Sequence, residues 1–279
     1  MTITLIGAGS LARALGPALR AAGYPIEAVA FRETAASRKR AKALARTLDS
    51  QAVPLEQTLP ATEIVWLCHT DDALPETASR LARKPGWRGK VVFHSSGALT
   101  SEVLAPLRRA GAYVASLHPM MTFVPGTTPL MQAVTFAVEG QRRAITVARR
   151  IVQDLGAEVF EIRKKAKVLY HALGSFSSPL VVATLVTAER VGRAAGLSRS
   201  QTRKVMGPIL QKTLRNYLER SAAAAFSGPI KRGDLETVRR HLAELKSVPQ
   251  AGDVYRALVK SAARDLPAAR KESLLRLLR

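Results

Sequence analysis

A glycine-rich turn near the start of the chain has the residue types and spacing to hold the diphosphate of a dinucleotide. The run Ile3–Ile6 is typical of a buried strand, Gly7-x-Gly9-x-x-Ala12 follows it, and apolar residues then recur at helical spacing. Gly7 permits a tight turn, Gly9 leaves room for a phosphate against the backbone, and Ala12 lets the helix pack closely on a sheet. The free N–H groups of the first helical turn would face the anion. The sequence therefore predicts cofactor contacts at Gly7, Gly9, Ser10, Leu11 and Ala12.

The residues after the second predicted strand, Ile26–Phe31, favour NADP over NAD as that dinucleotide. NAD-binding proteins usually place an acidic side chain there to hold the ribose 2′-hydroxyl, whereas this chain has Arg32. A guanidinium can bind a 2′-phosphate through two hydrogen bonds, and Thr34 and Arg38 would add a hydroxyl and a second charge. Glu33 leaves NAD as an alternative cofactor, because a shift of one residue in the predicted end of the strand would place an acid at the ribose position. Arg38 would alternatively belong to the exposed start of the next helix.

Polar side chains follow three further predicted strands, at the edge of a parallel sheet where ligands bind. We predict that His69 and Thr70 contact the cofactor. We predict that a second group contacts substrate: His94, Ser95, Ser96, Gly97 and His118. The alternative for the serines is a turn next to a helix capped by Thr100 or Ser101, and for His118 it is core packing. No Cys, Asp or Glu stands near the histidines at ligand spacing, so we predict no metal site.

The elements that must position these residues alternate between strand and helix over the first part of the chain. Through residue 162 the periodicity predicts these strands: Ile3–Ile6, Ile26–Phe31, Ala52–Leu55, Glu63–Leu67, Lys90–Phe93, Tyr113–Leu117, Val134–Val138 and Glu158–Ile162. Beyond it only helical periodicity remains, beginning with a long helix, Lys164–Ala195, that Pro179 should kink or interrupt. The sequence therefore predicts a Rossmann-type, doubly wound and mostly parallel α/β domain over 1–162, followed by an all-α domain over 163–279.

The composition of the chain limits the classes of function that it can have. The chain has 279 residues, 43 Lys and Arg against 21 Asp and Glu, and a formal net charge of +22. The arginines are dispersed along predicted helices and only 5% of residues are aromatic, so we expect a small anionic substrate rather than nucleic acid. One cysteine, no export signal and no apolar run of about 18 residues predict a cytoplasmic protein without a membrane span.

Four stretches carry a resemblance to a known family: the GAGSLARAL start, His94–Phe123, Lys167–Ala172 and Phe226–Leu242. The chain resembles bacterial proteins that join a Rossmann-like NADP-binding domain to a helical domain of unknown function. They belong to the group of 6-phosphogluconate and β-hydroxyacid dehydrogenases, ketopantoate reductase and pyrroline-5-carboxylate reductase. The resemblance implies NADP binding and a homodimer formed through the helical domain. The chain departs from the family pattern at Ser178-Pro179, where the family has Ser-Asn. The resemblance therefore does not carry over a substrate contact by the asparagine of the family pattern.

Lys167 and His171 are four residues apart on a predicted helix, so both side chains project from one face. The resemblance implies that Lys167 is the catalytic acid and that His171 orients it or the substrate. The alternatives are a solvated basic face shared with Arg163–Lys165 for Lys167, and a hydrogen-bonded core position for His171. The function expected is an NADP-dependent oxidoreductase for a small carboxylated 2-oxo, hydroxy or imino compound, with a ketopantoate reductase-like role as one form. The alternative is a non-catalytic, regulatory NADP-binding protein.

Overall fold

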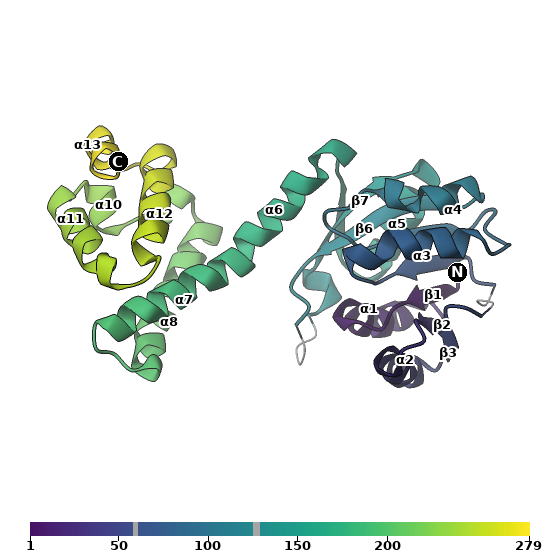
Figure 1. The fold of residues 1–279 in the computed structure, drawn as a ribbon. Helices are drawn as coiled ribbons and strands as arrows, with labels where there is room; N and C mark the ends of the chain where they lie inside the picture. The colour runs from purple at the N-terminus through teal and green to yellow at the C-terminus, as the bar shows by residue number, and fades with distance from the viewer. Residues whose placement is uncertain (58–60, 125–128) are drawn as a thin grey trace. The chain divides into compact units, whose positions relative to one another are not determined.

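A computed structural model describes residues 1–57, 61–124 and 129–279 of the chain (Figure 1). Within these residues the chain divides into two compact units, Met1–Phe176 and Ser177–Arg279. The division lies one helix beyond the predicted boundary at residue 162. The reason is that helix α6, Lys167–Ser177, buries its first residue against the sheet of the first unit.

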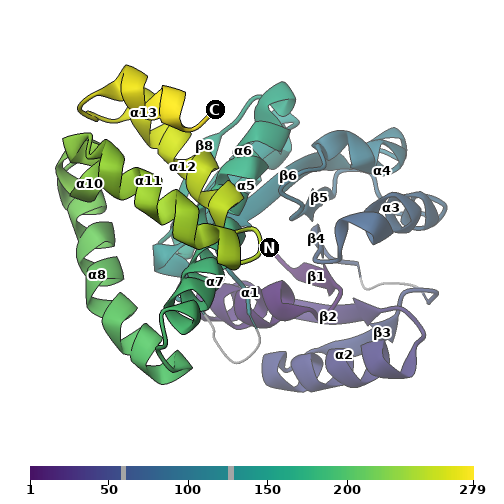
Figure 2. The same cartoon turned by 60° about the vertical axis from the view of Figure 1, so that its left-hand side comes forward.

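The first unit contains one sheet, formed among the described residues by eight strands: β1 Ile3–Ile6, β2 Ile26–Phe31, β3 Gln51–Pro54, β4 Ile64–Leu67, β5 Val91–His94, β6 Tyr113–Met120, β7 Thr135–Gly140 and β8 Glu158–Glu161. Their order is β3-β2-β1-β4-β5-β6-β7-β8, part of which can be followed in Figure 2. All neighbouring pairs are parallel except β6 and β7. The predicted Rossmann-type fold is therefore confirmed, because the order 3-2-1-4-5-6 is that of dinucleotide-binding sheets.

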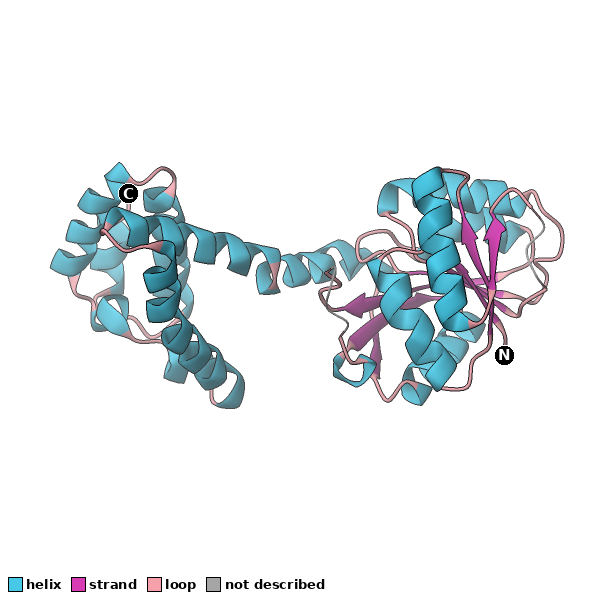
Figure 3. Cartoon of the chain, turned by 90° about the horizontal axis from the view of Figure 1, so that it is seen from below, coloured by secondary structure: helices cyan, strands magenta, loops and turns pink. Residues whose placement is uncertain are grey.

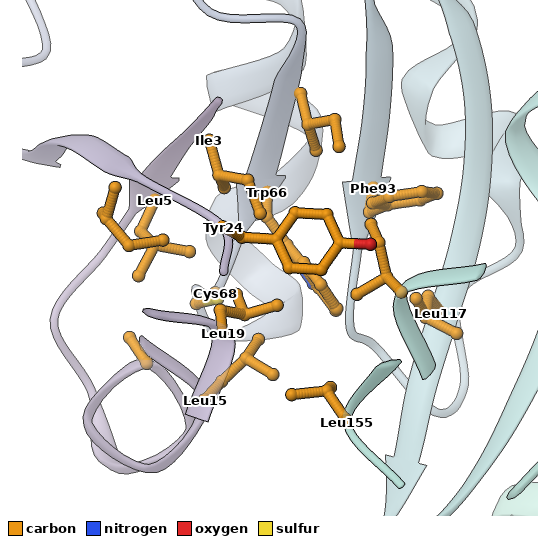
Figure 4. Packing of buried hydrophobic residues seen from close by; sticks show 14 of the residues in the cluster. Ile3, Leu5, Leu15, Leu19, Tyr24, Trp66, Cys68, Phe93, Leu117 and Leu155 are labelled. Atoms are coloured by element: carbon orange, nitrogen blue, oxygen red, sulfur yellow. The ribbon is translucent and has the colours of Figure 1, made fainter. Parts of the chain in front are cut away.

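Helices cover both faces of this sheet because alternate strand residues point to opposite sides. On one face, Trp66, Phe93 and Leu117 pack with α1 (Ser10–Ala21), α2 (Ala35–Leu48) and α5 (Arg142–Asp154), as Figure 4 shows in part. On the other face, strand residues such as Val65 and Val92 pack with α3 (Leu74–Ala82) and α4 (Ala105–Arg109). This core fixes the carboxyl ends of β1, β4 and β5, where the candidate functional residues begin.

Helices α3 and α4 are each preceded by a short 3₁₀ turn. The stretches Asp71–Ala73 and Ser101–Leu104 are 3₁₀ turns, and α3 and α4 start only after them. In both cases a proline occupies the first turn of the α-helix, where its missing N–H costs nothing. The predicted interruption at Pro179 is confirmed, since α6 ends at Ser177 and α7 begins at Pro179.

The second unit is entirely helical (Figure 3). Its helices are α7 Pro179–Ala194, α8 Arg199–Glu219, α9 Ala222–Ala225, α10 Gly228–Arg232, α11 Leu235–Glu244, α12 Ala251–Asp265 and α13 Lys271–Leu277. A small core around Val238, Val259 and Leu274 joins α11, α12 and α13. The predicted all-α domain is therefore confirmed.

The helical stretch Lys164–Ala194, which contains α6 and α7, is long and apolar enough by length and composition to cross a membrane. Its apolar window has a mean hydropathy of 1.4, and 6% of that window is buried. The sequence shows no uninterrupted apolar run here because Ser, Gly and His break it, although Val168–Ala188 contains no Asp, Glu, Lys or Arg. Core helices of soluble proteins pass the same test, so length and composition alone do not identify a span.

Candidate functional site

The glycine turn lies at the edge of a cavity of about 330 Å³ at the carboxyl ends of β1, β2 and β4. The strand order reverses between β1 and β4, which is where open α/β sheets bind ligands. Gly7 has a φ of +99°, and a Cβ there would lie 3.1 Å from the carbonyl oxygen of Cys68. Gly9 is the N-cap of α1 and has no side chain to bond the first N–H groups of the helix. Those N–H groups remain available to an anion in the cavity.

The described cavity wall carries three guanidinium groups, and they differ in part from the predicted set. Arg32 lines the cavity as predicted, while Arg13 and Arg40 line it together with Ser37. Ser37 and Arg40 are three residues apart on α2 and therefore share a face of that helix. That spacing was the signal in the sequence that could have identified Arg40.

The other predicted cofactor residues divide into two groups. Those in the cavity wall are Gly7, Gly9, Ser10, Arg32, His69 and Thr70. Four others lie outside the described wall: Leu11, Ala12, Thr34 and Arg38. Leu11 and Ala12 pack on the core, and Thr34 Oγ1 caps α2 by accepting a hydrogen bond from Ser37 N at 3.2 Å. Arg38 forms a 3.7 Å ion pair with Glu33, the acid that kept NAD open. Glu33 is not among the described residues that line the cavity.

His69 offers an unpaired polar atom beside this cavity. Its Nε2 is buried and has no hydrogen-bond partner among the described residues. Burial, together with the nearby Arg32 charge, lowers the pKa of His69 to about 4, so the ring is neutral near pH 7. A buried polar atom of this kind normally has a partner, and a ligand in the cavity would supply one. The glycine cradle, the guanidinium groups and this imidazole together fit a dinucleotide.

Lys167, at the start of α6, lies in the interior of the first unit. Its exposed fraction is 0%, and its Nζ donates to Ser116 Oγ on β6 at 2.5 Å. The carboxylate of Glu139 on β7 lies 4.0 Å from the same Nζ. Burial lowers the pKa of Lys167 to about 8, while Glu139 and Asp71 oppose that shift. The alternative of a solvated basic face is therefore wrong for Lys167, and its ammonium can release a proton near neutral pH.

The loop after β5 is held in place through Ser96. Ser116 Oγ donates to the carbonyl oxygen of Ser96 at 3.3 Å. Ser96 Oγ in turn accepts from the N–H groups of Ala98 at 3.2 Å and Leu99 at 2.8 Å. Neither Thr100 nor Ser101 caps the turn through its side chain, since Glu139 accepts from Ser101 N at 2.6 Å. The predicted substrate loop is thus connected to Lys167 through one serine hydroxyl.

His94 and Ser95, two of the predicted substrate contacts, already have partners inside the protein. His94 Nδ1 accepts from Ser96 N at 3.1 Å, and Ser95 Oγ accepts from Trp66 Nε1 at 2.7 Å. His94 is fully buried, and burial, with the nearby Lys167 charge, lowers the pKa of its ring to about 3. His94 is therefore a neutral residue of the interior, behind the loop.

The accessible part of this cluster is formed by His118, Tyr170 and His171. His118 Nδ1 lies 3.1 Å from Tyr170 Oη, and the ring centroids of His118 and His171 are 6.0 Å apart. A Cβ at Gly97 would lie 2.8 Å from His118 Nε2 and would overlap the His171 ring, so a larger residue there would displace both rings. Burial lowers the pKa of His118 to about 4 and raises that of Tyr170 to about 12. Tyr170 was not predicted, although it follows Lys167 by three residues, a helical neighbour spacing.

Two family models match the chain: a Rossmann-like domain over residues 1–119 and a domain of unknown function, DUF2520, over residues 134–262. The chain combines a Rossmann-like domain with a DUF2520 domain. The predicted resemblance is thereby confirmed. The Lys167–Ser116 hydrogen bond joins a residue of one matched region to a residue of the other. No curated protein matches the chain.

Solved structures with the same fold cover nearly the whole chain. A Bacteroides fragilis protein proposed to be an NADP oxidoreductase is 22% identical, with a TM-score of 0.75 over 93% of this chain and 96% of that one. A Thermotoga maritima protein is 23% identical, with a TM-score of 0.74 over 94% and 97%. An imine reductase from Myxococcus stipitatus, solved with NADP⁺, is 18% identical, with a TM-score of 0.69 over 100% of both chains. The chain therefore shares the fold of these structures, among them an imine reductase that was solved with NADP⁺.

We expect the protein to lose stability as the pH falls from about 6.5 towards 3, because three buried or half-buried imidazoles are neutral when folded. The pKa is lowered to about 4 for His69 and His118 and to about 3 for His94. Between these values and the ordinary pKa of about 6.5, the unfolded chain binds more protons, so the free energy of unfolding rises with pH. The contribution is complete above that range and is lost on acidification.

Urea unfolding between pH 7 and pH 4.5 measures this effect. His94→Gln should reduce the acid-induced loss of unfolding free energy, whereas His241→Gln, which changes an exposed histidine on α11, should not. Equal pH dependence in wild type and His94→Gln would contradict the assignment of His94 as a buried neutral ring.

Proposed function

We propose that this protein is an NADP-dependent oxidoreductase acting on a small carboxylated 2-oxo, hydroxy or imino substrate. The observation that carries the proposal is the cavity at the glycine turn, with Arg13, Arg32 and Arg40 in its wall. The first helical turn of α1 suits a diphosphate, and the guanidinium groups suit a 2′-phosphate. Glu33, the acid that would favour NAD, pairs with Arg38 and is not among the described residues that line the cavity.

The substrate site of the proposal is the cluster at the carboxyl ends of β5 and β6. When bound, NADPH would supply a hydride to the carbon of a C=O or C=N bond. A proton and a charge-stabilising group must then come from the protein, and Lys167, Tyr170, His118 and His171 are the described donors gathered there. The fold shared with imine reductases supports the imino form of the substrate, and a ketopantoate reductase-like role stays within the same proposal.

Each side chain has a separate role in this proposal. Lys167 provides a positive charge and an exchangeable proton behind the Ser96–Gly97 loop, where negative charge would develop on a substrate oxygen or nitrogen. His171 is exposed and orients the substrate. His118 and the Ser95–Gly97 backbone form the wall on which a carboxylate would rest. His94 supports that wall from inside.

A second candidate function is a non-catalytic, regulatory NADP-binding protein. The observation that favours it is the complete burial of Lys167, whose Nζ is bonded to Ser116 and not exposed to a substrate in this structure. The Ser178-Pro179 departure from the family pattern favours it too. The two candidates agree on the cofactor and differ on the consequence of removing the lysine.

The cofactor part of the proposal is tested by Gly9→Ala. A methyl group there would meet only Cys68 O, at 3.9 Å, so the fold tolerates it, but it would occupy space next to the diphosphate. We expect the NADPH dissociation constant, measured by fluorescence titration, to rise about tenfold or more. Gly207→Ala on α8, which also adds a methyl group to open space, serves as the control. Unchanged NADPH affinity in Gly9→Ala, or no NADPH binding by wild type, would contradict the proposal.

We also propose that the protein forms a homodimer through its helical domain and does not cross a membrane. Support for the dimer comes from the exposed apolar side chains on α8, namely Val205, Ile209, Leu210, Leu214, Tyr217 and Leu218. Apolar surface of this extent on a helix commonly marks a protein interface. Light scattering after gel filtration should give the mass of a dimer, and Ile209→Glu with Leu214→Glu should give a monomer. If cells are lysed without detergent and the protein is recovered in the membrane fraction, the proposal is contradicted.

A further inference from the structure

We propose that Glu139 is a positioning residue that holds the Lys167 ammonium against the loop after β5 by means of a buried ion pair. The inference depends on the proposed function only for its catalytic consequence, because the ion pair itself is a property of the first unit. Nothing in the sequence pattern singled out Glu139. It lies near the end of β7, outside every motif that indicated a site.

Glu139 is placed and fixed by the sheet. It stands directly opposite Ser116 in the antiparallel pairing of β7 with β6. Its exposed fraction is 2%, and both carboxylate oxygens accept hydrogen bonds from Ser101, from the backbone N–H at 2.6 Å and from Oγ at 2.8 Å. A carboxylate held from two directions in this way cannot turn away from its neighbours. It therefore presents Oε1 to Lys167 Nζ at a fixed distance of 4.0 Å.

Lys167 needs such a partner because it is fully buried. Removing an ammonium from water strongly disfavours its charged form, and an opposite charge within about 4–6 Å restores it by an amount equivalent to one to three pKa units. The charged or titratable groups that act on Lys167 come from several elements: Glu139 on β7, Asp71 in the 3₁₀ turn before α3, His94 on β5 and His118 on β6. Only the two carboxylates favour the ammonium, and Glu139 has the larger effect.

The ion pair has a consequence for the candidate substrate loop. Lys167 donates to Ser116 Oγ, and Ser116 Oγ donates to the carbonyl oxygen of Ser96. An uncharged amine would have a free lone pair and could accept from Ser116 instead, which would release the Ser96 carbonyl. Glu139 therefore determines both the charge behind the loop and the direction of the hydrogen bonds that hold it.

A purely structural role for Glu139 predicts something different. Through Ser101 N, the carboxylate also fixes the start of the 3₁₀ turn Ser101–Leu104. If that were its whole contribution, the glutamine variant would change stability but not the protonation of Lys167. The titration of Lys167 therefore separates the two roles.

The experiment is an NMR titration of the full-length protein labelled with ¹³C at lysine Cε, with Lys167 identified as the signal absent from Lys167→Arg. Wild type should show a Lys167 midpoint near pH 8. Glu139→Gln, which keeps the shape and loses the charge, should lower the midpoint by about one unit or more, a tenfold weaker proton affinity. Ser101→Ala is the matched control, since it removes the hydrogen bond to Oε2 but leaves the carboxylate charge and the backbone N–H bond to Oε1, the oxygen that faces Lys167. Its midpoint should stay within about 0.3 units of wild type.

Three outcomes would overturn the inference: an unchanged midpoint in Glu139→Gln, an equal shift in Ser101→Ala, or a wild-type Lys167 that is already neutral at pH 7. The last can be read from wild type alone if Glu139→Gln does not fold. Fluorescence titration with NADPH separates a failure of the Glu139 inference from a failure of the proposed NADP-dependent function. Glu139 is not among the described residues of the cofactor cavity, so Glu139→Gln should bind NADPH as wild type does.

Discussion

Lys167→Met should lower NADPH-dependent turnover by about 10²–10⁴-fold while NADPH affinity stays within about twofold of wild type. The expected loss is large because Lys167 is the one described lysine that is fully buried within the candidate cluster, next to the loop on which substrate would rest. Methionine fills a similar volume without the charge or the proton. The cofactor cavity should be unaffected, since Lys167 is not among its described lining residues.

The measurement starts with a screen of 2-oxo acids and cyclic imines for NADPH oxidation by wild type. Turnover of the best substrate is then compared between wild type, Lys167→Met and Lys164→Met. Lys164 lies on the same stretch but is exposed and pairs with Glu102, so its variant should retain turnover. Bound NADPH reports that each variant is folded. Full turnover in Lys167→Met would refute the catalytic assignment, and a screen without any substrate would favour the regulatory candidate.

Arg32→Ala combined with Arg40→Ala should weaken NADPH binding by about 10²–10³-fold and leave NADH binding nearly unchanged. Both guanidinium groups line the cavity, and a hydrogen bond between charged groups contributes about 1.5–3 kcal/mol. The effect should be specific to the 2′-phosphate, which NADH lacks. It should also diminish as salt concentration rises, because the arginines are exposed.

Arg38→Ala is the informative control for this prediction. Arg38 is adjacent in sequence and has the same charge, but it pairs with Glu33 outside the described cavity wall. Its replacement should change NADPH affinity by about twofold at most. A large loss of NADPH affinity in Arg38→Ala, with little change in Arg40→Ala, would mean that Arg38 binds the 2′-phosphate, as the sequence predicts.

The contrast between Arg38 and Arg40 shows where sequence reasoning reached its limit at the site. The glycine spacing and strand periodicity predicted the turn, the strands and the cavity edge, because those patterns depend on local geometry. The choice between neighbouring arginines depends on the rotational phase of α2 relative to the cavity. That phase is fixed by the core contacts of Ala41, Leu44 and Leu48, and the sequence prediction did not combine their spacing with that of Ser37 and Arg40.

Glu139 and the domain boundary were missed for a related reason. Both depend on contacts between residues far apart in sequence: Glu139 meets Ser101 and Lys167, and Lys167 meets Ser116. A lysine beside other basic residues gives no sign that it turns inward. The composition of 163–177 is helical like the residues that follow, so periodicity placed it with the helical domain, whereas burial of Lys167 places α6 with the sheet.

Cys68 in the wall of the cofactor cavity has a consequence for how the protein meets oxidants. It is the chain's single cysteine, and burial raises the pKa of its thiol to about 12, so almost no thiolate forms near neutral pH. The thiolate, and not the thiol, is the form of sulfur that attacks peroxides and alkylating reagents. The nucleotide pocket should therefore keep its shape under oxidative stress, and its occupancy should follow the supply of nucleotide and not the redox state of a cysteine.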